Sequence, residues 1–277
     1  MTDTARVPAV PRRRARRPKA PRRKVAILSV FGEVLITAGA LVFLFLAWQL
    51  WWNDRVIAAS QSDAAEEISQ NWINNHAGVG GATSSDQGVA ESPDVTADPV
   101  TSGEPVVATA PDAGEPIAVL YVPRFGEDYR RTIAEGVGSS VLNSTTLGIG
   151  HYPDTQMPGE LGNFAIAAHR SAYGGGMHLI NELRVGDPIY VHTADGYYTY
   201  RFRDLSYVEP TDIDVIAPVP NAPLAAPTDR IITLTSCNPL YSTDERIIAY
   251  GVLDSWQPTS DGPPSGLDSI IEAQAKA

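Results

Sequence analysis

The sequence predicts a mainly β domain that follows a single apolar helix near the N-terminus. Short runs of β-branched and aromatic residues recur through the second half of the chain, and turn signals such as Gly186-Asp187 separate them. The helix is predicted by the 28-residue stretch Val25–Trp52, whose only charged residue is Glu33. Many short strands with few helices favour a closed barrel or a sandwich.

Charge is divided unevenly between the two ends of the chain. Ten of the 21 lysines and arginines lie in residues 1–24, whereas 30 acidic residues oppose 11 basic ones from Asn53 onward. A basic block before a membrane-spanning helix predicts a cytoplasmic N-terminus, and the Trp48, Trp51 and Trp52 cluster suits the membrane interface. Contact of the block with anionic membrane lipid is favoured over nucleic-acid binding. A cleaved signal peptide is the alternative, but its apolar region normally has about 7–15 residues.

Composition also predicts how the chain is organised. A short juxtamembrane helix is expected at Ser62–Asn74, with Ser62 or Asp63 as its N-cap. Residues 75–114 contain no Lys or Arg and show no periodicity, which is typical of a disordered acidic linker. We therefore expect a cytoplasmic tail (1–24), a single transmembrane helix (25–52), a juxtamembrane helix and linker (53–114), an extracellular domain (115–254) and a flexible C-terminal tail (255–277).

The strands of the domain are predicted from β-branched and aromatic composition. Alternation of apolar and polar residues is clearest over Tyr197–Arg203. A short helix is expected at Met177–Leu183, after three consecutive glycines. The expected strands are Ile117–Val122, Tyr129–Ile133, Asn163–Ala168, Pro188–Thr193, Gly196–Leu205, Ile231–Thr235 and Ile247–Tyr250.

Cys237, the single cysteine, stands at the end of one expected strand. Asn238-Pro239 ends that strand, because proline cannot donate to a β-ladder. Arg246 opens the next strand, so an antiparallel return places its guanidinium beside the thiol. A lone thiol outside the cell is unusual without a function. The alternative is that Cys237 is a small buried apolar residue.

A cysteine nucleophile reacts as the thiolate and needs a nearby imidazole to exchange protons. His169 is the favoured candidate, because it directly follows the apolar strand Asn163–Ala168 and a strand end presents a side chain rigidly. The other histidines are expected to be structural or surface groups, or to lie in loops around the site: His76, His192, His151 and His178.

These segments resemble the sortase family, whose signature is TLxTC with a histidine ending an earlier strand and an arginine on the next one. Here the signature is Thr233–Cys237, with Ser236 in place of the usual second threonine, preceded by GNFAIAAHR and followed by Arg246. The resemblance covers Glu115–Leu253. The patterns HYPDTQMPGELGNFAIAAHR and TSCNPLYSTDERIIAYG are similar to those of class E sortases of high-GC Gram-positive bacteria.

The resemblance implies a closed eight-stranded β-barrel and a thiol transpeptidase. Cys237 would cleave an LPxTG or LAxTG sorting signal of a secreted protein between Thr and Gly, forming a thioester. The acceptor would be an amine of a lipid-linked peptidoglycan precursor. His169 would exchange protons with the two amines, and Arg246 would hold substrate carbonyls or the oxyanion. Residues expected to contact the signal are Thr235, Ser236, Tyr152, Val215 and Ile216.

Other site classes find no support in the sequence. There is no HExxH, no cysteine pair and no DxDxDG loop, so neither metal nor cofactor is expected. Two alternatives to a sortase remain. An L,D-transpeptidase requires glycine before its cysteine, where Ser236 stands here. A non-enzymatic, membrane-tethered surface module would have no reason to keep a thiol flanked by His and Arg.

Overall fold

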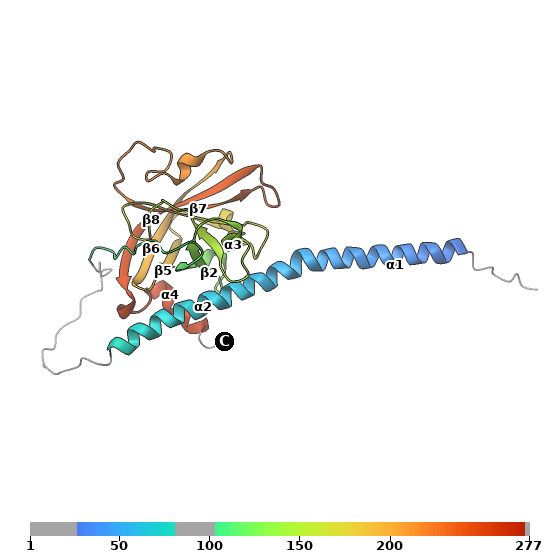
Figure 1. Ribbon diagram of the computed structural model, residues 1–277, viewed down its shortest axis with the longest axis horizontal. Coiled ribbons are helices and arrows are strands. Elements are labelled where there is room, and N and C mark those ends of the chain that lie inside the picture. Colours follow the sequence, from blue (N-terminus) through green and yellow to red (C-terminus); the bar gives the residue numbers. More distant parts are fainter. Residues whose placement is uncertain (1–26, 81–102, 275–277) are drawn as a thin grey trace, which may run out of the picture. The chain divides into compact units, whose positions relative to one another are not determined.

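The computed structural model describes residues 27–80 and 103–274 (Figure 1). The apolar helix α1 (Ile27–Ala47) belongs to one unit, and the chain from Trp48 onward forms the other. Within α1, residues 29–47 are long and apolar enough to cross a membrane, by length and composition. A π-helical segment (Trp48–Trp52) connects α1 along the chain to α2 (Asn53–Gly80).

Eight strands close into a barrel in the order β1-β2-β3-β4-β7-β8-β6-β5. The pairs β2–β3 and β4–β7 are parallel, and the other neighbours are antiparallel. This confirms the prediction of a mainly β, closed eight-stranded barrel. The strands are β1 (Pro116–Tyr121), β2 (Arg130–Glu135), β3 (Gly148–His151), β4 (Gly162–Ala168), β5 (Pro188–His192), β6 (Gly196–Val208), β7 (Arg230–Asn238) and β8 (Glu245–Pro258).

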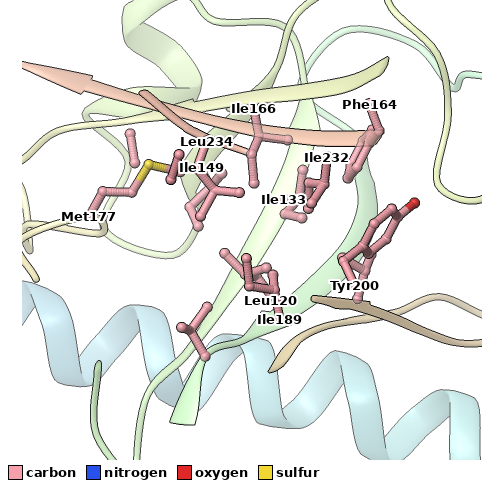
Figure 2. Close-up of a cluster of buried hydrophobic side chains, with 14 of the residues drawn as sticks. Leu120, Ile133, Ile149, Phe164, Ile166, Met177, Ile189, Tyr200, Ile232 and Leu234 are labelled. Atoms are coloured by element: carbon pink, nitrogen blue, oxygen red, sulfur yellow. The ribbon is translucent and has the colours of Figure 1, made fainter. Parts of the chain in front are cut away.

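Alternate side chains of the strands fill the barrel interior. Figure 2 shows Ile232 and Leu234 of β7 beside Phe164 and Ile166 of β4 within this core. Because successive side chains of a strand point to opposite faces, the residues between them point out of the barrel. On β7 these outward residues end at Cys237. Core packing therefore decides which face of the barrel carries the thiol.

Two local predictions differ from the structure. β3 was not predicted from the sequence, because its four residues Gly-Ile-Gly-His have low β propensity and depend on pairing with β2 and β4. The helix expected at Met177–Leu183 is only a 3₁₀ turn, Ile180–Glu182. The other short helical segments are the 3₁₀ turns Pro123–Phe125, Ile213–Ile216 and Thr259–Asp261 and the α-helical turn α3 (Ser139–Leu142).

The helix α2 is longer than the expected Ser62–Asn74 and packs on the barrel. Its Ala65 is buried in an apolar cluster with Val119 and Tyr121 of β1. The stretch expected to be linker therefore begins in helix, and its residues 81–102 lie outside the described part of the chain. The last part of the expected linker, residues 103–114, also contacts the barrel, since Glu104 forms an ion pair with Arg230 at 2.5 Å.

The segment expected to be a flexible C-terminal tail contains ordered structure. Strand β8 continues to Pro258, and α4 (Ser265–Gln274) follows. Leu267 and Ile271 of α4 are buried in the same cluster as Val119 and Tyr121. Their spacing of four residues places both on one face of the helix, and their burial stabilises its docking.

Candidate active site

Cys237 and Arg246 lie on the neighbouring strands β7 and β8, and His169 directly follows β4, the other neighbour of β7. Cys237 on β7 and Arg246 on β8 are directly paired in the antiparallel register, so their side chains share a face. The parallel register of β4 and β7 pairs Ala167 with Thr235, and His169 directly follows the end of β4 at Ala168, two residues beyond this pair, as Cys237 is on β7. The structure thus gathers a thiol, an imidazole and a guanidinium that lie far apart in sequence.

The residues just before Cys237 attach its strand to β4. The Ser236 hydroxyl donates to the carbonyl of Ala168 at 2.8 Å, and the Thr235 hydroxyl donates to the carbonyl of Ile166 at 3.2 Å. Both side chains are buried, whereas Cys237 is half-buried. The Tyr152 hydroxyl lies 3.0 Å from Oγ1 of Thr235 and so reaches the outward face of β7. The Ser236 hydroxyl therefore links β7 to the end of β4, directly before His169.

His169 is held by groups that the sequence did not reveal. Its Nε2 lies 2.8 Å from Oδ1 of Asn143, which follows α3, and its ring lies 5.1 Å from that of Tyr173, centroid to centroid. Burial lowers the pKa of His169, and the carboxylate of Asp54 opposes that change. Asn143 precedes His169 by 26 residues. No local sequence pattern connects the two residues.

Arg170 is a second residue that sequence reasoning missed. Its buried guanidinium donates to the carbonyl of Cys237 at 3.4 Å, to Oδ1 of Asn238, and to Oδ1 of Asn181 at 3.1 Å. Its Nε has no partner within the described residues. Arg170 thus ties the loop after His169 to the end of the strand that carries the thiol. The adjacent motif His169-Arg170 was its only sequence signal.

Arg246 is placed by its own hairpin. Its Nη1 donates to the carbonyls of Thr243 and Glu245, both at 3.0 Å. Among the described residues it forms no ion pair, because the Glu245 carboxylate instead accepts from the Asn238 amide at 2.8 Å. The guanidinium has five N–H donors, so this arrangement leaves donors for a ligand beside Cys237.

The loop between β6 and β7 lies against the same outward face, further from the thiol. The Asn163 amide donates to the carbonyls of Val215 at 3.3 Å and Ala217 at 3.0 Å, and its oxygen accepts from the Thr233 hydroxyl at 2.7 Å. Val215 is buried and Ile216 is half-buried. The structure therefore places these two candidates at the far end of the face, four residues from Cys237 along β7.

The two loop histidines have different surroundings. His151 is buried at the end of β3, with Nδ1 2.7 Å from Oε2 of Glu135 and Nε2 2.9 Å from the Thr155 hydroxyl. Both ring nitrogens are therefore occupied, and His151 is a structural group. His178 is exposed and donates from Nδ1 to the carbonyl of Arg170 at 3.0 Å. It supports the loop after His169.

A cavity of about 440 Å³ lies beside the loop that follows His169. Ser171 of that loop and Tyr241 of the β7–β8 hairpin line it, as do Asp54 and Arg55 of α2 and the buried Arg131 of β2. Its lining thus includes groups of both charges, which suits a ligand with both. No cluster of metal-binding side chains occurs in the part of the chain that the structure describes.

Comparison with known proteins agrees with this geometry. Residues 120–254 match the sortase domain family. Sortase SrtE1 of Streptomyces coelicolor is 32% identical over 263 residues, 93% of this chain and 66% of that protein. Sortase SrtE2 of the same organism is 30% identical over 232 residues, 82% of this chain and 81% of that protein.

Solved structures extend the agreement to the fold. The crystal structure of sortase E1 from Streptomyces coelicolor with a tripeptide in the active site aligns with a TM-score of 0.51 at 35% identity. The alignment covers 58% of this chain and 99% of that one. The fold, the signature around Cys237 and the similarity to these relatives establish that the chain belongs to the sortase family of cysteine transpeptidases.

Proposed function

We propose that the chain cleaves a C-terminal sorting signal of the LPxTG or LAxTG type between Thr and Gly and transfers the protein to an amine of a lipid-linked cell-wall precursor. The observation that supports this proposal is the strand arrangement: Cys237 of β7 pairs with Arg246 of β8, and His169 directly follows β4, the other neighbour of β7. The tripeptide in the active site of the solved relative supports peptide binding in this region.

The cycle begins when Nδ1 of the neutral His169 imidazole takes the proton of the Cys237 thiol, which gives a thiolate and an imidazolium. In the first half-reaction, the Cys237 thiolate attacks the threonine carbonyl, whose oxygen takes the electron pair and becomes an oxyanion. Donors of Arg246 stabilise that charge, where a preorganised cation has most effect. Collapse of the intermediate breaks the bond to glycine, and the leaving amine takes a proton from His169. A thioester on Cys237 and a free glycine amine result.

In the second half-reaction, the acceptor amine attacks the thioester carbonyl and gives a proton to His169. Collapse forms an amide and releases the Cys237 thiolate, so each turnover restores the thiolate and the imidazolium. Because Nε2 of His169 faces Asn143, we assign both proton transfers to Nδ1. The same imidazole nitrogen thus serves as acid in the first half-reaction and as base in the second.

The two substrates would use different sides of the site. We assign the sorting signal to the outward face near Tyr152, where Ile216 offers a half-exposed apolar contact. We assign the acceptor to the cavity beside Ser171, where the Asp54 carboxylate favours an ammonium group. Arg131, buried in the same lining, would favour an acidic group on the acceptor.

We further propose that α1 anchors the enzyme in the cell membrane with the barrel outside. The apolar helix supports the anchor, and the basic residues 1–24, which lie outside the described part of the chain, support a cytoplasmic N-terminus. An L,D-transpeptidase is not favoured because the chain is a sortase by family. A non-enzymatic module is not favoured because Cys237 pairs with Arg246 and His169 ends the strand beside them.

The test uses the full-length chain, purified in detergent, with LPxTG and LAxTG peptides and a panel of amine acceptors. We expect intact-mass spectrometry to detect a thioester on Cys237 and chromatography to detect the transpeptidation product. Cys237→Ala should abolish both, and circular dichroism should show that this variant stays folded. Peptide cleavage that persists in Cys237→Ala would refute the assignment.

A further inference from the structure

One face of α2 is buried against the barrel at intervals of four residues. Gln61, Ala65 and Ser69 are all buried and lie on consecutive turns of the helix. Ser69 bonds to Nδ1 of His192 at 3.0 Å, at one end of this row. Gln61, at the other end, reaches the loops that surround His169. The helix is therefore part of the catalytic domain rather than a spacer before it.

The Gln61 side chain fills a space that two glycines leave open. A Cβ added at Gly148 would lie 2.5 Å from Nε2 of Gln61, and one at Gly174 would lie 2.5 Å from its Oε1. Both glycines also have positive φ, which side-chain-bearing residues rarely adopt. The local backbone thus accommodates the amide of Gln61 where other residues would exclude it.

The amide of Gln61 connects two segments that are distant in sequence. Its Nε2 donates to the carbonyl of Ser144 at 2.8 Å and to the carbonyl of Tyr173 at 3.0 Å. Ser144 directly follows Asn143, which bonds to Nε2 of His169, and the Tyr173 ring contacts the imidazole. Both N–H donors of one amide are therefore used to hold the two neighbours of His169 in place.

We propose that Gln61 is a positioning residue for His169, and that α2 thereby contributes to the active site without touching substrate. Its removal leaves two carbonyls without their donor and frees the Asn143 and Tyr173 segments to move. A misplacement of about 1 Å in a catalytic group can cost about 10²-fold in rate. The inference rests on the proposed role of His169, and its test includes a measurement that needs no turnover.

The test compares Gln61→Met with Ser69→Ala in the full-length chain. Gln61→Met keeps the side chain's length but removes both donors, whereas Ser69→Ala loosens the same helix away from His169. We expect Gln61→Met to lower kcat about tenfold to a hundredfold with KM for the peptide nearly unchanged. Ser69→Ala should keep wild-type kcat even if its melting temperature falls as much.

The ¹⁵N resonances of the His169 ring, assigned by difference from His169→Asn, provide the measurement without substrate. They should move in Gln61→Met and stay in place in Ser69→Ala. If Gln61→Met unfolds, Gln61→Glu, which retains the shape but replaces the amide donors by a carboxylate, should give the same shift. A folded Gln61 variant with wild-type kcat and unchanged His169 resonances would overturn the proposal. So would a Ser69→Ala variant that changes kcat and these resonances as much as Gln61→Met does.

Discussion

Oδ1 of Asn143 lies 2.8 Å from Nε2 of His169 and accepts a hydrogen bond from it. In the neutral imidazole this places the proton on Nε2 and leaves the lone pair on Nδ1. An amide in this place orients the ring without adding charge. Burial lowers the pKa of His169, so the neutral imidazole is favoured down to a lower pH than for a free histidine.

Two substitutions of Asn143 distinguish its effect on the orientation of the His169 ring from the effect of a charge beside that ring. We expect Asn143→Ala to lower kcat about tenfold to a hundredfold, because the ring is no longer held. Asn143→Asp should raise the pKa of His169, because a carboxylate beside Nε2 stabilises the imidazolium. The pH limb of kcat/KM that reports His169 should then move to higher pH. Ser140→Ala, an exposed change in α3, is the control, and an unmoved limb in Asn143→Asp would contradict this account.

Arg246→Lys tests whether the guanidinium acts on the transition state. A lysine cannot hold the Thr243 and Glu245 carbonyls and also present a planar fork to substrate. We expect kcat and kcat/KM to fall together by about 10²–10³, with KM nearly unchanged. Steady-state kinetics and melting temperature decide the matter. Full activity with a slightly lower melting temperature would show that Arg246 only supports the hairpin.

Arg170→Lys tests the hydrogen bonds by which Arg170 connects the loop after His169 to the end of β7. One ammonium cannot reach the Cys237 carbonyl, Asn238 and Asn181 in the planar arrangement that Arg170 uses. Loss of hydrogen bonds from a buried charged group typically costs about 1.5–3 kcal/mol each. We expect a clear fall in melting temperature and a loss of kcat of about tenfold or more. Arg201→Lys, at an exposed ion pair with Asp254, should change neither quantity.

His192 makes the stability of the barrel depend on pH. Burial lowers its pKa to about 3, and its Nδ1 bonds to Ser69, which in turn accepts from Tyr121 at 2.8 Å. Between about pH 6.5 and 3 the unfolded chain binds a proton that the folded chain does not. This group therefore stabilises the fold above that window, and its contribution is lost as pH falls, by up to about 1.4 kcal/mol per pH unit.

The variant His192→Phe should flatten the pH dependence of unfolding. The phenyl ring can keep the stacking on Tyr197, whose centroid lies 4.1 Å from that of His192, but it cannot titrate. Chemical denaturation at pH 7.5, 5 and 4 measures the slope of the free energy of unfolding against pH. Leu224→Ala, at a fully exposed position, should retain the wild-type slope. An unchanged slope in His192→Phe would exclude His192 as its source.

The sequence by itself determined that the domain is mainly β and that Cys237 and Arg246 stand at facing strand positions, whereas the closed barrel was implied by the family resemblance. The β-branched runs that became β7 and β8 are recognisable because their composition suits a pleated, half-buried surface. The short connection between them allows only an antiparallel return, and that return pairs Cys237 with Arg246. Similarly, the apolar run before His169 predicts a strand end. These features can be read from the sequence because each depends only on residues that are close together in the chain.

Only the tertiary structure decided which residues support His169 and Cys237. Asn143, Arg170 and Gln61 are polar residues in segments without clear periodicity, and their partners lie elsewhere in the sequence. The length of α2 and the docking of α4 also depend on burial against β1. These contacts exist only once the barrel has closed, because its surface supplies the carbonyls and apolar side chains that fix them.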